Sequence, residues 1–101
     1  MAGERRKIMT KIYDVIAEKY SGDPRPDIIL FYDEDKETAI KFMREYKKKH
    51  GFSIYENHNE FSVANLMLRD RTSDGKELSR KSYIELFDIY GNRRKEEQAA
   101  G

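Results

Sequence analysis

Residues 26–51 read PDIILFYDEDKETAIKFMREYKKKHG, and this stretch decides the fold because it predicts a buried strand followed by a polarised helix. The strand is expected over residues 28–32, whose apolar side chains suit a pleated sheet. The four acidic residues within 33–37 match the positive N-terminal end of a helix, and the basic residues 47–50 match its negative C-terminal end. Gly51 is expected to end the helix.

The segment before this stretch predicts another helix. Residues 4–20 place apolar side chains at steps of three and four, which is typical of an amphipathic helix. The stripe consists of Met9, Ile12, Tyr13, Ile16 and Tyr20. Residues 21–26 contain a glycine and two prolines, so the helix is expected to end there in a loop.

The segment after Gly51 predicts strands joined by turns. Residues 52–56 alternate in polarity and residues 61–69 alternate more weakly, so a strand is expected in each, with a turn at 57–59 between them. Asp74 and Gly75 are a strong signal for a hairpin turn.

Residues 78–90 support two interpretations. A helix is favoured by an apolar stripe from Tyr83 to Tyr90, by Ser82 with Glu85 as a capping box, and by Gly91 as a helix end. A strand is favoured because the segment YIELFDI is rich in strand formers and follows the predicted turn. We prefer a strand at the start of the segment and leave the rest open.

Together these elements predict an α+β fold with a single domain over residues 1–101. The expected architecture is a two-layer α/β sandwich in the order α-β-α-β-β, followed by a strand or a short helix. Its small, mostly antiparallel sheet should have helices on one face. Residues 1–3 and 92–101 are expected to be frayed ends.

Composition limits the classes of function. The chain has 20 basic and 19 acidic residues and a net charge of +1, so binding to nucleic acid would need a local basic patch. It has no cysteine, which excludes disulfides and thiolate chemistry. The sequence contains neither a signal-peptide pattern nor a membrane-spanning apolar run, so we expect a cytoplasmic protein.

Carboxylates after the first predicted strand are weak candidates for a metal site. Asp33 and Asp35 are oxygen ligands of the kind Mg²⁺ prefers, and they follow the carboxyl end of a strand. Helix capping explains the same residues more simply. The sequence offers no nucleophile with a paired base, so no catalytic residue and no cofactor are predicted.

The order of strand, Tyr-Asp, helix and short strand in ILFYDEDKETAIKFMREYKKKHGFSIYEN resembles the opening of the ferredoxin-like small nucleases of the Cas2 and VapD type. The resemblance covers residues 28–57 and implies a magnesium-dependent nuclease with Asp33 as a metal-binding acid. The chain departs from that pattern by its predicted helix before the strand and by lacking a clear second helix and fourth strand. We therefore treat the likeness as shared local architecture.

Clusters of basic residues suggest a nucleic-acid-binding module as an alternative function. If the clusters met on one face with tyrosines between them, they would bind phosphates and stack bases. The residues of this alternative are Lys47, Lys48, Lys49, Arg93, Arg94 and Lys95.

Seven tyrosines and four methionines favour a protein–protein interface, because tyrosine, methionine and arginine are enriched at interface cores. The leading hypothesis is a small non-catalytic protein that binds a protein partner or a second copy of itself. An accessory or inhibitor protein of a phage or mobile element, of the anti-defence type, belongs to this class. The expected partner-binding residues are Tyr55, Tyr90, Arg69, Arg71, Arg80 and Lys81.

Overall fold

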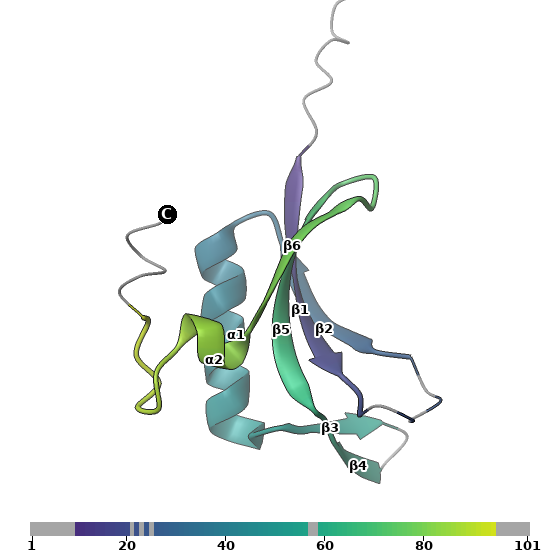
Figure 1. Ribbon diagram of the computed structural model, residues 1–101, viewed down its shortest axis with the longest axis vertical. Coiled ribbons are helices and arrows are strands. Elements are labelled where there is room, and N and C mark those ends of the chain that lie inside the picture. The colour runs from purple at the N-terminus through teal and green to yellow at the C-terminus, as the bar shows by residue number, and fades with distance from the viewer. Residues whose placement is uncertain (1–9, 21, 23, 25, 57–58, 95–101) are drawn as a thin grey trace, which may run out of the picture.

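The computed structural model describes residues 10–20, 22, 24, 26–56 and 59–94. For residues 55, 56 and 59–61 it describes the backbone alone. Within them an antiparallel sheet has the strand order β2-β1-β5-β6, and β3 pairs with β4 in a separate hairpin (Figure 1). The elements are β1 (Lys11–Glu18), β2 (Ile28–Asp33), α1 (Lys36–His50), β3 (Ser53–Glu56), β4 (Asn59–Ser62), β5 (Asn65–Thr72), β6 (Glu77–Ser82) and α2 (Tyr83–Leu86). No helix among the described residues is long and apolar enough to span a membrane.

The predicted N-terminal helix is wrong over its described part, because Lys11–Glu18 form the strand β1. This strand lies between β2 and β5 in the sheet and pairs with both. Four consecutive residues, 14–17, are buried, since both faces of the central strand are covered. In a strand buried on both faces, apolar residues no longer alternate with polar ones along the sequence. Their spacing can then match the spacing of an amphipathic helix.

The strand and helix predicted from residues 26–51 are confirmed as β2 and α1. Asp35 is the N-cap of α1, and its Oδ2 accepts hydrogen bonds from the Thr38 backbone N–H at 3.0 Å and the Thr38 hydroxyl at 2.6 Å. Asp33 Oδ1 accepts the Asp35 N–H at 2.7 Å. At the other end Gly51 has φ 64° and donates its N–H to the Lys47 carbonyl at 2.8 Å.

The strand predicted over residues 61–69 is divided between β4 and β5. Val63 and Ala64 form the break, and their N–H groups donate to the carbonyls of Phe52 and Glu18. The break lets the chain leave the β3–β4 hairpin and enter the larger sheet beside β1. Of the predicted turn at 57–59, residues 57 and 58 lie outside the described part of the chain.

Residues 78–90 contain both of the predicted structures, first a strand and then a short helix. The predicted hairpin turn at Gly75 is confirmed, and β6 follows it as the return strand. Ser82 then starts the single-turn helix α2, and its N–H donates to Glu85 Oε1 at 2.7 Å as the capping box requires. Gly91 is not the helix end that we expected, because α2 ends at Leu86.

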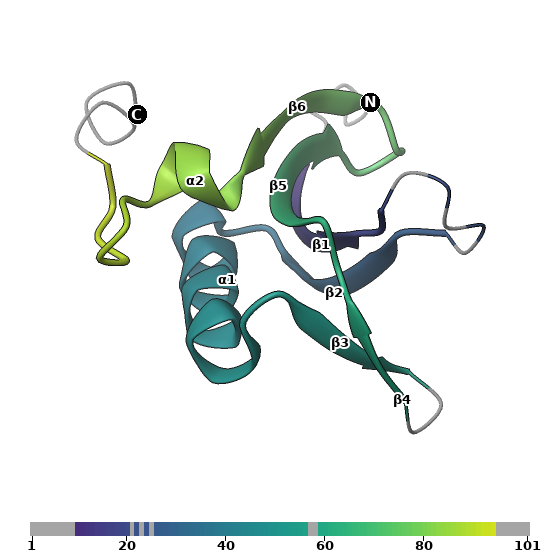
Figure 2. The same ribbon diagram turned by 60° about the horizontal axis from the view of Figure 1, so that its bottom comes forward.

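The core lies between α1, α2 and one side of the curved sheet (Figure 2). Helix α1 contributes Ala39, Ile40 and Met43, and α2 with the residue after it contributes Tyr83, Leu86 and Phe87. The side chains that meet them from β1 and β5 are Val15, Ala17, Leu66 and Leu68. The expected α+β class with a small antiparallel sheet is confirmed, whereas the order of elements begins with two strands.

Candidate functional site

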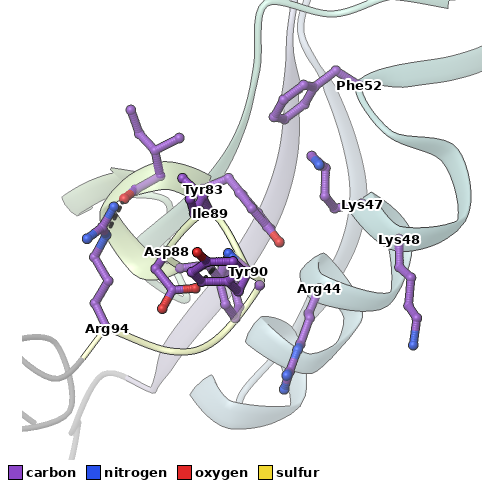
Figure 3. A pocket seen from close by; sticks show the side chains of 12 residues that line it. Arg44, Lys47, Lys48, Phe52, Tyr83, Asp88, Ile89, Tyr90 and Arg94 are labelled. Atoms are coloured by element: carbon purple, nitrogen blue, oxygen red, sulfur yellow. Dashed lines mark hydrogen bonds between the residues drawn. The ribbon is translucent and has the colours of Figure 1, made fainter.

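A groove of about 530 Å³ lies between the C-terminal half of α1 and the segment formed by α2 and the residues after it (Figure 3). Its floor is aromatic and its walls carry both cationic and apolar side chains. The lining residues are Arg44, Lys47, Lys48, Phe52, Tyr83, Ile84, Phe87, Asp88, Ile89, Tyr90, Gly91 and Arg94.

Three stacked or edge-packed rings form the floor of the groove. Tyr83 lies 4.7 Å from Phe87 and 6.2 Å from Phe52, measured between ring centroids. Tyr83 and Phe87 are buried, so the floor is part of the core and has a fixed shape. Burial raises the pKa of the Tyr83 hydroxyl, and the nearby charge of Arg44 opposes this rise.

The cationic wall comes from one side of α1. Arg44, Lys47 and Lys48 are separated by three and four residues and therefore lie on the same helix face. Lys47 Nζ lies 5.0 Å from the centroid of Phe52 and 5.3 Å from that of Tyr83, within range of a cation–π interaction. Lys47 and Lys48 also offset the negative C-terminal end of the α1 dipole. Arg44 lies a turn earlier, so the helix dipole does not account for its charge.

The opposite wall is a tight turn over residues 88–92 that is held by its own hydrogen bonds. Asp88 Oδ1 accepts the N–H groups of Tyr90 and Asn92, both at 2.9 Å. The Asp88 N–H donates to the Asn92 carbonyl at 2.9 Å, and Gly91, with φ 82°, donates to the Asp88 carbonyl. The turn nevertheless leaves Ile89 88% exposed and Tyr90 82% exposed.

Contacts of the two arginines after the turn fix this wall to the rest of the fold. Arg93 forms an isolated bridge with Phe87, and its Nη1 donates to Glu37 Oε1 on α1 at 2.9 Å. Arg94 donates its Nε to the Ile84 carbonyl at 2.7 Å and its backbone N–H to the Leu86 carbonyl. Ile84, on the exposed side of α2, is itself 65% exposed.

Of the residues predicted to bind a partner, Tyr90 lines the groove. Arg69, Arg71 and Arg80 lie together on another surface, the sheet face opposite to the core, where they take part in ion pairs. Lys81 pairs in register with Leu68 and so lies on the other face of β6 from Arg80. Tyr55 is in β3, and its side chain lies outside the described part of the structure.

A fully buried carboxylate organises the arginines of the sheet face. Asp14 Oδ2 accepts from Arg69 Nε at 2.9 Å and from Arg71 Nε at 2.6 Å, and the Asp14 side chain is not exposed at all. This hydrogen bond raises the pKa of Arg71. Arg80 pairs with Glu77 at 2.9 Å, which lowers the pKa of Glu77. These arginines have carboxylate partners within the chain.

The basic residues of the nucleic-acid alternative are divided by the structure. Lys47, Lys48 and Arg94 line the groove, whereas Lys49 is exposed and does not line it. Arg93 is engaged by Glu37, and Lys95 lies outside the described residues. The metal candidates Asp33 and Asp35 act as capping groups, and no cluster of three or more potential metal-ligating side chains occurs in the described ranges.

Sequence reasoning missed Arg44, Ile84 and Ile89 as groove residues. Arg44 had a usable signal, since it is three and four residues before Lys47 and Lys48. The sequence also contained a signal for Ile84 and Ile89, because they fall outside the apolar stripe that runs from Tyr83 to Tyr90. Bulky apolar residues outside a buried stripe are candidates for an exposed surface.

No protein-family model matches this chain, and neither a curated protein nor a solved structure matches it.

Proposed function

We propose that this chain is a small non-catalytic binding protein that acts through a protein–protein interface, with the groove at its centre. The observation that carries the proposal is the exposure of Ile84, Ile89 and Tyr90 along one wall. Large apolar side chains that gather at the edge of a cavity, beside polar groups, are typical of an interaction site. Tyrosine is moreover one of the residues that most often anchor such interfaces.

The order of the exposed turn supports this proposal. The hydrogen bonds of Asp88 fix the backbone that carries Ile89 and Tyr90 before any partner arrives. A surface that is already ordered loses less conformational entropy on binding, so more of the contact energy contributes to affinity. In this proposal the α+β domain is a two-layer scaffold that supports the groove.

The chemistry of the lining favours binding over catalysis. Asp88 is the acidic residue of the lining, and its Oδ1 already accepts two backbone N–H groups. The lining contains no histidine, serine or threonine that could form a nucleophile–base pair. An accessory or inhibitor role in the cytoplasm, of the anti-defence type found in phages and mobile elements, is the biological form we propose.

One observation favours nucleic-acid binding as a second candidate. Arg44, Lys47, Lys48 and Arg94 gather in one groove with Tyr90, and cations beside an exposed ring bind phosphates and stack bases. The isoleucines argue for a protein, because an isoleucine has no flat π-face for a base to stack on. A magnesium-dependent nuclease is the third possibility, and the capping roles of Asp33 and Asp35 weigh against it.

A capture experiment with matched variants tests the proposed function. The tagged full chain is incubated with lysate of its native host, with and without nuclease treatment, and bound proteins are quantified by mass spectrometry. Ile89→Asp should lose the specific partner, whereas Leu78→Asp, at an exposed position of β6 outside the groove, should retain it. Equal capture by both variants, or capture abolished by nuclease in the wild type, would contradict the proposal.

A further inference from the structure

The groove has a strongly cationic character that the net charge of the chain does not reveal. Its lining holds four cations and one carboxylate, although the whole chain has a net charge of +1. The four cations are Arg44, Lys47, Lys48 and Arg94. The carboxylate is Asp88, and four cations against one carboxylate leave the groove with a local excess of positive charge.

The cations of the groove also differ from the other arginines in how they are paired. Arg69, Arg71, Arg80 and Arg93 all contact carboxylates of the chain. Arg44 and Lys48 make no ion pair with a carboxylate among the described residues, and both side chains are exposed. Arg44 Cζ lies 6.0 Å from the centroid of Phe87, a cation–π contact that leaves its N–H groups to other partners. Within the described fold these two cations are therefore available to a partner.

Three of the four cations, Arg44, Lys47 and Lys48, lie on the wall formed by α1, whereas Arg94 lies on the other wall beside the exposed apolar side chains (Figure 3). Arg44 and Lys48 project from α1, while Ile89 and Tyr90 come from the turn across the floor. An occupant must therefore present negative groups to one wall and a bulky apolar group to the other. The aromatic floor offers that apolar group a dry contact.

From this charge complementarity we infer that the groove binds an acidic peptide segment of its partner, in which aspartates or glutamates flank one bulky apolar residue. This inference rests on the proposed function and names the chemistry of the partner. Carboxylates would pair with Arg44 and Lys48, and the apolar residue would pack on Tyr83 between Ile89 and Tyr90. Electrostatic complementarity of this kind selects partners and speeds their association.

Selection from a random peptide library tests the inference without a known partner. Twelve-residue peptides displayed on phage are selected on the wild-type chain and on the double variant Arg44→Glu/Lys48→Glu. The wild type should enrich peptides with several acidic residues around one Leu, Ile, Phe or Trp. The double variant should reject these peptides and enrich basic ones, because its wall now carries the opposite charge.

Affinities of the best synthetic peptide give a quantitative form of the same test. Fluorescence anisotropy should show binding about tenfold weaker to Arg44→Glu/Lys48→Glu, since two exposed ion pairs are lost and replaced by repulsion. The matched control Lys41→Glu/Lys49→Glu changes the net charge by the same amount on the same helix, outside the groove, and should bind within about twofold of the wild type.

The possible results distinguish a failure of the acidic-peptide inference from a failure of the proposed protein-binding function. If the selected peptides need Ile89 for binding but are not enriched in acidic residues, the inference of an acidic peptide is wrong and the proposed protein–protein interface is retained. Peptides insensitive to both Ile89→Asp and the charge reversal would count against the groove itself, and so against the proposed function. Tighter binding of a single-stranded oligonucleotide than of any selected peptide, lost on charge reversal, would replace both with the nucleic-acid alternative.

Discussion

Replacing Asp14 with alanine should destabilise the fold by about 3 kcal/mol, although the residue lies outside the groove. Its carboxylate is fully buried and accepts hydrogen bonds from Arg69 and Arg71 on the neighbouring strand. The variant leaves two guanidinium groups side by side without the anion that holds them together. Each is then partly buried, like-charged with the other and poorly solvated.

The magnitude follows from the exposure of the two arginines. Breaking a fully buried pair by removing one partner costs about 3–5 kcal/mol. Arg69 and Arg71 retain 23% and 19% exposure, so water can solvate them in part, and the lower end of that range applies. For a domain of about 100 residues this loss lowers Tm by roughly 10–25 °C.

Urea unfolding followed by circular dichroism measures this loss. The control is Glu77→Ala, which removes an exposed carboxylate that lies 2.9 Å from Arg80 and 3.9 Å from Arg69. It should shift the urea midpoint far less than Asp14→Ala does, because water solvates this carboxylate and screens both pairs. Adding Arg69→Met and Arg71→Met to Asp14→Ala should recover at least about 1 kcal/mol, because the uncompensated charges disappear while the side-chain stems stay. If Asp14→Ala unfolds within about 1 kcal/mol of the wild type, the reasoning from a buried carboxylate is refuted.

Three further predictions concern α1 and the groove floor. Asp35→Ala should cost about 1 kcal/mol in urea unfolding, because it removes the N-cap acceptor of Thr38, and a loss below a few tenths would contradict the capping role. Gly51→Ala should cost about 1–3 kcal/mol by the same assay from backbone strain alone, since nothing lies within 4 Å of the added Cβ; an unchanged midpoint would refute this. Because burial raises the pKa of Tyr83, stability should be full below the pKa of an unfolded tyrosine, about 10, and fall as pH rises through the folded pKa. Tyr83→Phe should flatten that alkaline decline and exposed Tyr90→Phe should not; equal slopes would show that Tyr83 is not the cause.

Helix α1 could be predicted from sequence because every signal for it is local. Its N-cap, its acidic first turn, its basic last turn and its terminal glycine all lie within residues 33–51. Each of these effects acts over a single turn of helix. The capping box at Ser82 is local in the same way, and it too is present in the structure.

Strand β1 could not be predicted because its burial comes from distant parts of the chain. Asp14 lies opposite Arg69, 55 residues later, and this pairing makes a carboxylate acceptable in the middle of a sheet. Without that partner an aspartate between apolar residues indicates the polar side of a helix. The groove is non-local for the same reason, since Arg44 and Tyr90 line one cavity only because α2 packs on the core beside α1.

The near-zero net charge of the chain gave a poor guide to its surface, and the pairing of individual charges explains why. The arginines of the sheet face are matched by Asp14, Glu18 and Glu77, so that surface is nearly neutral. Much of the acidic complement is thus used inside the fold or in capping α1. Positive charge is left over on the wall formed by Arg44 and Lys48, which make no ion pair with a carboxylate among the described residues. A net charge sums over both regions, whereas a partner contacts only one of them, and this is why a balanced chain can still offer an acidic segment a cationic groove.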